Sequence, residues 1–213
     1  MKINYDLKLK EELELIKDSK PTLLLHVCCG PCSSNVIKEL CEYFQITIHY
    51  SNSNIYPKEE YDRRLDELKV FIDHFNKDYN QDIQVIEDYY DHSEWLDHMY
   101  PLKDFPEGSL RCKLCYNLRM RRAYDYAYIN HYDYWTTVLS VSPHKNSQWI
   151  NEIGERWNKN HLKFLYADFK KNDGYLKSTQ MTKLYNMYRQ DYCGCEFSLR
   201  ESIERKERKQ SDN

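Results

Sequence analysis

Short apolar runs alternate with longer amphipathic segments along most of the chain. The apolar or β-branched runs predict five strands, at 22–27, 45–50, 82–87, 134–141 and 162–167. The segments around them carry apolar residues at helical spacing, at 4–19, 33–44, 58–77, 92–98, 110–130, 146–159 and 177–189. Strands that alternate with helices of this length indicate an α/β fold, with a doubly wound parallel sheet and helices on both of its faces.

A chain of 213 residues is long enough for one domain with a proper core. No repeat or low-complexity linker divides it. We expect a helical extension at 1–21, a single α/β domain at 22–196, and a charged tail at 197–213 that is solvated or loosely helical.

Composition narrows the class of protein. Charged residues make up 31%, hydrophobic residues 41% and aromatic residues 15%, which excludes a disordered chain. No apolar run is long enough to span a bilayer, and the first twenty residues lack the apolar core of a secretory signal. We therefore expect a cytoplasmic protein without a membrane partner. A net charge of −3 argues against a globally basic nucleic-acid binder but leaves room for a local basic patch.

The carboxyl ends of the predicted strands carry the candidate chemistry, because ligands of open α/β sheets bind there. The sequence CCGPC follows the first strand at 28–32, and Asn54 follows the second. The loop after the fourth strand holds Ser142, His144, Lys145 and Asn146. We expect these polar side chains to contact the substrate. The five glycines form neither of the glycine-rich phosphate-binding motifs, which excludes a glycine-rich dinucleotide-binding loop.

Seven of the eight cysteines fall into three groups, and Cys41 is expected to be a structural thiol. In a reducing compartment, clustered cysteines are more often metal ligands or redox groups than structural disulfides. Cys28, Cys29, Cys112 and Cys115 supply four thiolates, the number that a [4Fe–4S] cluster or a zinc site needs. Cys32 is then surplus: it either stays free or ligates an additional iron.

The pair Cys193 and Cys195 is separated by one glycine. A disulfide between them would be strained, and strained disulfides are the labile, redox-active ones. The alternative is two separate thiols after the last helix of the domain.

A basic stretch adjoins the second cysteine pair. Between Leu110 and Arg122 there are five basic residues and no acidic one. Helical spacing places Arg111, Cys115, Arg119 and Arg122 on one stripe, which either meets the phosphates of a nucleic acid or is a solvated face. Both interpretations are open.

Six segments together resemble the cobalamin-independent epoxyqueuosine reductases, the QueH-like family. They are HVCCGPCS at 26–33, NIYPKEEYDRR at 54–64, RCKLCYNLRMRRA at 111–123, TTVLSVSPHKN at 136–146, FLYADFKKNDGYLKS at 164–178 and YRQDYCGC at 188–195. The resemblance covers about residues 22–196. It implies a fold related to the adenine-nucleotide hydrolase group.

The resemblance also implies a function: the last step of queuosine synthesis, reduction of epoxyqueuosine at the wobble position of tRNAs with a G-U-N anticodon, those for tyrosine, histidine, asparagine and aspartate. It implies a [4Fe–4S] cluster on Cys28, Cys29, Cys112 and Cys115, and a redox-active disulfide at Cys193 and Cys195. An electron donor is required, and the sequence does not identify it. Two other functions remain: a metal-free thiol–disulfide oxidoreductase, and a zinc-stabilised RNA-binding module with four cysteine ligands.

Overall fold

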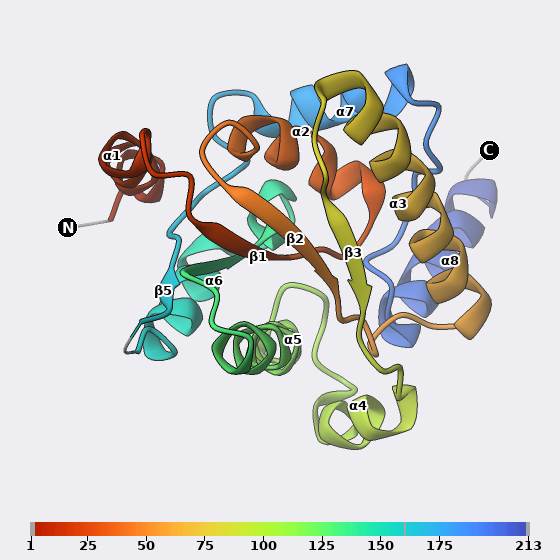
Figure 1. Cartoon of the computed structure of the whole chain (residues 1–213). Coiled ribbons are helices and arrows are strands. Elements are labelled where there is room, and N and C mark those ends of the chain that lie inside the picture. Colours follow the sequence, from red (N-terminus) through yellow and green to blue (C-terminus); the bar gives the residue numbers. More distant parts are fainter. Residues whose placement is uncertain (1–2, 160, 212–213) are drawn as a thin grey trace.

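A five-stranded parallel sheet forms the centre of the molecule (Figure 1). The computed structural model describes residues 3–159 and 161–211. The strands are β1 (Thr22–His26), β2 (Gln45–Tyr50), β3 (Gln84–Glu87), β4 (Tyr134–Thr137) and β5 (Lys163–Phe164), in the order β3-β2-β1-β4-β5. Every neighbouring pair is parallel. This arrangement confirms the predicted doubly wound α/β fold.

Helices cover both faces of the sheet (Figure 1). One face carries α2 (Gly30–Leu40), α3 (Lys58–Tyr79) and α7 (Gly174–Leu184), and the other carries α5 (Leu110–Ile129) and α6 (Ser147–Arg156). Further elements are α1 (Tyr5–Ile16), α4 (His92–Met99), α8 (Glu196–Ser211) and the 3-10 turns η1 (Tyr100–Leu102) and η2 (Val138–Val141). Within the described ranges, each helix is too short or too polar to cross a bilayer.

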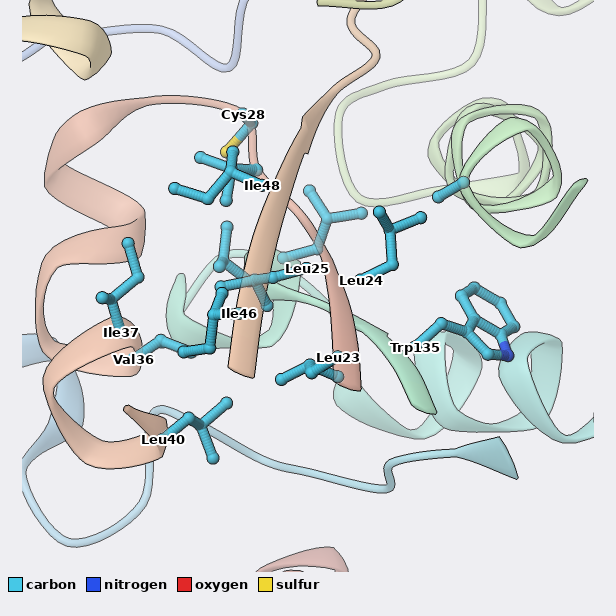
Figure 2. Packing of buried hydrophobic residues seen from close by; sticks show 14 of the residues in the cluster. Leu23, Leu24, Leu25, Cys28, Val36, Ile37, Leu40, Ile46, Ile48 and Trp135 are labelled. Atoms are coloured by element: carbon cyan, nitrogen blue, oxygen red, sulfur yellow. The ribbon is translucent and has the colours of Figure 1, made fainter. Parts of the chain in front are cut away.

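The core follows from the alternation of side chains along β1. Leu23 and Leu25 pair in register with Ile46 and Ile48 of β2, so these four side chains share the face that packs on α2. Figure 2 shows Val36, Ile37 and Leu40 of α2 directed at this face. Leu24 pairs with Trp135 of β4 on the opposite face, and both are fully buried. A strand buried on both sides needs the continuous apolar run that the sequence shows.

Four of the five predicted strands are shorter in the structure, and the fourth and fifth lose the most residues. The fourth ends at Thr137, because the Thr137 side chain accepts a hydrogen bond from the Leu139 nitrogen and begins the turn η2. Its apolar continuation is buried in that turn and not in the sheet. The edge strand β5 pairs through only two residues. Helix α2, by contrast, begins earlier than predicted, at Gly30. Pro31 is compatible with the first turn, because the backbone nitrogens there donate no hydrogen bond within the helix.

The first and the last helix also pack on the domain. Leu9, Leu13 and Ile16 of α1 belong to the main core. Residues 197–211 of the expected charged tail belong to helix α8, and 212–213 lie outside the described residues. The Phe197, Ser198 and Ser202 side chains are buried. Phe197 packs in a second, smaller cluster with Trp95, Met99, Cys115 and Cys195. Helix α8 therefore packs beside two of the candidate site cysteines.

Close contact between α6 and β5 yields a stability prediction. A Cβ atom at Gly154 would lie 2.3 Å from the ring of Phe164, which is buried. We expect Gly154→Ala to lower the free energy of unfolding in urea by about 1–3 kcal/mol, because the ring must move out of a packed position. The exposed Arg156→Ala on the same helix should stay within about 0.5 kcal/mol of the parent. A Gly154→Ala protein as stable as the parent would contradict this account of the packing.

Candidate metal and redox site

Three thiols meet where β1 passes into α2. Cys29 is the residue before the first turn of α2, and its extended backbone turns the chain into the helix. The sulfur atoms of Cys28, Cys29 and Cys32 all lie within 4.8 Å of one another, and those of Cys28 and Cys29 are 3.9 Å apart. Three thiols at this separation, on the carboxyl edge of a parallel sheet, can bind one metal centre.

The three thiols differ in pKa because they hydrogen-bond to one another. The neighbouring thiols of Cys29 and Cys32 donate toward Cys28 and lower its pKa well below that of a free cysteine, and the positive charges of Arg119 and Lys145 act in the same direction. The same interaction with Cys28 raises the pKa of Cys29 to about 12. Hydrogen bonds with Cys28 and Cys29 also raise the pKa of Cys32. Cys28 is thus the first to become the thiolate, which is the form that binds metal.

Four further thiols line a neighbouring small cavity. Cys112 and Cys115 project from the first turns of α5, and Cys193 and Cys195 come from the loop before α8. Burial raises the pKa of Cys115 to about 12 and that of Cys195 to about 11. The Gly108 nitrogen donates to the Cys112 sulfur at 3.2 Å. All eight cysteines of the chain are free thiols in the structure, so the expected disulfide between Cys193 and Cys195 is not formed there.

Arg64 of α3 holds the loop that carries Cys193 and Cys195. Its guanidinium is 1% exposed, pairs with Glu60 at 2.7 Å, and donates to the carbonyl oxygens of Cys193 at 3.1 Å and Tyr192 at 3.5 Å. The Gly194 carbonyl accepts a hydrogen bond from the Tyr56 nitrogen at 2.8 Å. These bonds place the loop on the rim between β2 and α3.

Two more cations face the thiols. Arg119 of α5 is 3% exposed and donates to the Asn52 side chain, while its Nε has no hydrogen-bond partner among the described residues. Burial alone would lower the pKa of Lys145, but the thiol groups of Cys193, Cys28 and Cys32 raise it. Positive charge at these positions stabilises thiolates in a largely buried site.

The structure brings three of the predicted substrate contacts to one cavity of about 310 Å³. Ser142, His144 and Lys145 line it together with Cys28, Cys32 and Cys193. Asn54 instead lines the small cavity beside Cys112 and Cys115, and its buried Oδ1 has no partner within the described chain. Asn146 is exposed, and its side chain accepts a hydrogen bond from the Trp149 nitrogen at the start of α6. Cys193 lines both cavities, so the two adjoin.

The arginines of α5 bind neighbouring protein groups. Arg111 is 3% exposed, donates to the Lys103 carbonyl and pairs with Glu201 of α8 at 2.9 Å. Arg122 pairs with Asp88 at 2.8 Å and donates to the Ser53 hydroxyl at 2.9 Å. With Arg119 buried as well, these side chains do not form a solvated face. Their contact with substrate stays a prediction.

Two residues of the site were not identified from the sequence. Arg64 lies three residues after Tyr61 and four before Leu68, so it falls on the apolar face of its helix. A charged residue on that face was the one feature of the sequence that could have identified it. Gln190 donates to the Cys29 sulfur at 3.0 Å. No pattern in the sequence distinguishes this glutamine, because the contact joins residues 161 positions apart.

A parallel α/β domain with clustered thiols and buried cations at the carboxyl edge of its sheet belongs to the class of thiol-based metal or redox enzymes. Comparison with known proteins specifies the family. The family model for "Epoxyqueuosine reductase QueH" matches residues 23–201. The chain belongs to this family.

Individual relatives agree with this result. The Streptococcus pyogenes epoxyqueuosine reductase QueH is 39% identical over 202 residues, which are 93% of this chain and 79% of that protein. The Thermotoga maritima protein of the same name is 30% identical over 188 residues, 88% of this chain and 93% of that protein. Among solved structures, the U34-tRNA thiolase NcsA from Methanococcus maripaludis with its [4Fe–4S] cluster is similar over 93% of this chain and 69% of that one. Its TM-score is 0.47 at 13% identity, which is too distant to inform function.

The loop at Gly194 yields a second prediction. Its φ is +133°, and a Cβ there would lie 3.0 Å from Arg64 Nη1 and 3.2 Å from Ile55 Cγ1. We expect Gly194→Ala to displace the loop and speed alkylation of the buried Cys195 in the metal-free, reduced protein. Gly108→Ala is the matched control, since its φ is +84° but no atom lies within 4 Å of the added Cβ. Equal Cys195 alkylation rates in the parent and in Gly194→Ala would show that this contact does not hold the loop.

Proposed function

We propose that this chain is an oxidoreductase that reduces epoxyqueuosine to queuosine at the wobble position of tRNA. Family membership supports the reaction, and the observation that carries it in this chain is the convergence of thiols on one rim. Loss of the epoxide oxygen as water, leaving an alkene, consumes two electrons and two protons. A site for this reaction must hold redox groups and a proton source next to a cavity for the base.

We further propose a [4Fe–4S] cluster on Cys28, Cys29, Cys112 and Cys115. The donor set fits such a group: Cys28, Cys29 and Cys115 are buried and Cys112 is half-buried, Cys28 readily becomes a thiolate, and the buried Arg119 offsets its charge. When bound, the cluster supplies electrons one at a time. Cys32 lies within the same sulfur triad, and we propose it as the ligand of an additional iron or as a free catalytic thiol.

The remaining groups are assigned to the substrate and to electron storage. Cys193 and Cys195 release two electrons and two protons if they oxidise to a disulfide, which matches the stoichiometry of the reduction. Lys145 Nζ keeps its proton beside the thiolates and lines the cavity with Ser142 and His144, so it is placed to donate a hydrogen bond to the epoxide oxygen. Asn54 and Asn146, and Arg111, Arg119 and Arg122 of α5, complete the proposed contacts.

We propose tRNAs with a G-U-N anticodon as the partners, together with an external electron donor that regenerates the dithiol. Because the substrate is tRNA, the cytoplasm is the proposed location. An anaerobic absorption spectrum separates this function from its alternatives: a cluster gives a broad visible band, and neither a metal-free oxidoreductase nor a zinc module does.

The ligand assignment predicts the effect of single serine substitutions. Cys28→Ser, Cys29→Ser, Cys112→Ser and Cys115→Ser should each remove most bound iron, because a cluster held by four thiolates loses a ligand in each variant. Iron and sulfide are measured after anaerobic reconstitution. Cys41→Ser, at a thiol outside the site, is the control and should keep its iron. Full iron and sulfide in two or more of the four variants would overturn the assignment.

The redox pair predicts a different pattern. Cys193→Ser and Cys195→Ser should keep iron near the parental amount and lose most turnover with a chemical reductant, because the pair stores electrons and holds no metal. Turnover is read from the nucleosides released by digestion of the tRNA. Loss of iron in these variants would place the ligands elsewhere, and full turnover would remove the pair from the mechanism.

A further inference from the structure

One side-chain amide contacts a candidate ligand sulfur from outside the cysteine set. Gln190 Nε2 donates to Cys29 Sγ at 3.0 Å, and Gln190 lies in the segment between α7 and Cys193. A metal-bound thiolate has no proton and can only accept a hydrogen bond. Such a sulfur therefore fixes the amide with its nitrogen toward Cys29 and its oxygen directed elsewhere.

The other end of this amide lacks a partner. Gln190 Oε1 is buried and accepts no hydrogen bond from any described residue. Ser178 Oγ, on α7, is also buried without a partner in the described chain, and the Ser178 side chain is 4% exposed. Both residues line the 310 Å³ cavity with Cys28 and Lys145. Native proteins leave few buried polar groups unpaired, so two on one cavity wall indicate a ligand that pairs with them.

We propose that Gln190 is a positioning residue that connects the substrate base to Cys29. Its Nε2 holds the Cys29 sulfur, while its Oε1 accepts a hydrogen bond from an N–H or O–H group of the modified nucleoside. Ser178 Oγ binds a second polar group of the same ligand. This inference rests on the proposed function, because it takes that nucleoside as the occupant of the cavity.

The hydrogen bond to the Cys29 sulfur should change a measurable quantity, the reduction potential of the group that this sulfur holds. A hydrogen bond to a ligand sulfur stabilises the more negative, reduced state of the group that the sulfur holds. Gln190 should therefore raise the reduction potential of that group. A residue that merely packs the loop would leave the potential unchanged.

The first experiment measures the midpoint potential of the reconstituted protein by anaerobic titration of its visible absorption band. Gln190→Leu removes the donor, and the near-isosteric Gln190→Glu replaces it with an acceptor, so both should move the potential to more negative values while iron content stays parental. Gln148→Leu, at an exposed glutamine that bonds Glu152 on α6, is the control and should leave the potential unchanged. If Gln190→Leu fails to hold iron, Gln190→Glu decides. An unshifted potential with full iron overturns the proposal.

The second experiment measures binding without turnover, in the absence of reductant. Affinities are compared for one tRNA with epoxyqueuosine or with unmodified guanine at the wobble position. Ser178→Ala and Gln190→Leu should each reduce the preference for the modified tRNA about three- to tenfold, the loss expected for one hydrogen bond. A parent protein without this preference would contradict the proposed function. A parental preference kept in both variants would overturn the Gln190 and Ser178 assignment alone.

Discussion

The buried guanidinium of Arg64 is the constraint on which the site depends. A charge with 1% exposure is stable only when it is paired, and the pairing here is shared between two parts of the chain: Glu60 on its own helix, and the backbone carbonyls of Tyr192 and Cys193. The Tyr188 hydroxyl also donates to Glu60 at 3.2 Å. Undocking of the 188–195 segment would leave Arg64 without its two carbonyl acceptors and Glu60 without the Tyr188 hydroxyl, so only the ion pair within α3 would remain. The rim and this segment are therefore stable together, and the docked segment brings Gln190 and Cys193 beside the CCGPC loop.

Charge balance explains how so many thiols can lie close together in a largely buried site. Thiolates in a buried cluster repel one another unless cations lie nearby. Arg64, Arg119 and Lys145 supply positive charge from three different elements or loops, which surround the cysteines instead of following them in the sequence. The basic stretch on α5 is part of this balance: Arg119 acts on Cys115 and Cys28, and Arg111 ties α5 to α8 through Glu201.

The local sequence pattern was sufficient to predict the sheet and the clustering of thiols in the first cysteine loop. The run TLLLHV specified a strand buried on both faces, and Cys28, Cys29 and Cys32 followed its end, so their approach could be predicted. The true end of β4 could not, because it depends on the Thr137 side chain capping a turn. The contacts of Gln190 with Cys29 and of Arg64 with Cys193 join distant residues through the docked segment, and a single sequence carries no local signal for them. Likewise, helical spacing placed Arg119 on the cysteine stripe of α5, but only the structure shows that it is buried and bonded to Asn52 in the loop after β2.

The most direct test of the account is the conversion of the nucleoside itself. Protein reconstituted anaerobically with iron and sulfide, given a strong reductant and tRNA that carries epoxyqueuosine, should yield queuosine in digests analysed by mass spectrometry, with the loss of one oxygen atom from the modified base. The same protein without iron should leave the epoxide intact. Conversion at an equal rate in metal-free protein, or unchanged epoxyqueuosine with a fully assembled cluster, would contradict the claim that these clustered thiols hold the metal centre of an epoxyqueuosine reductase.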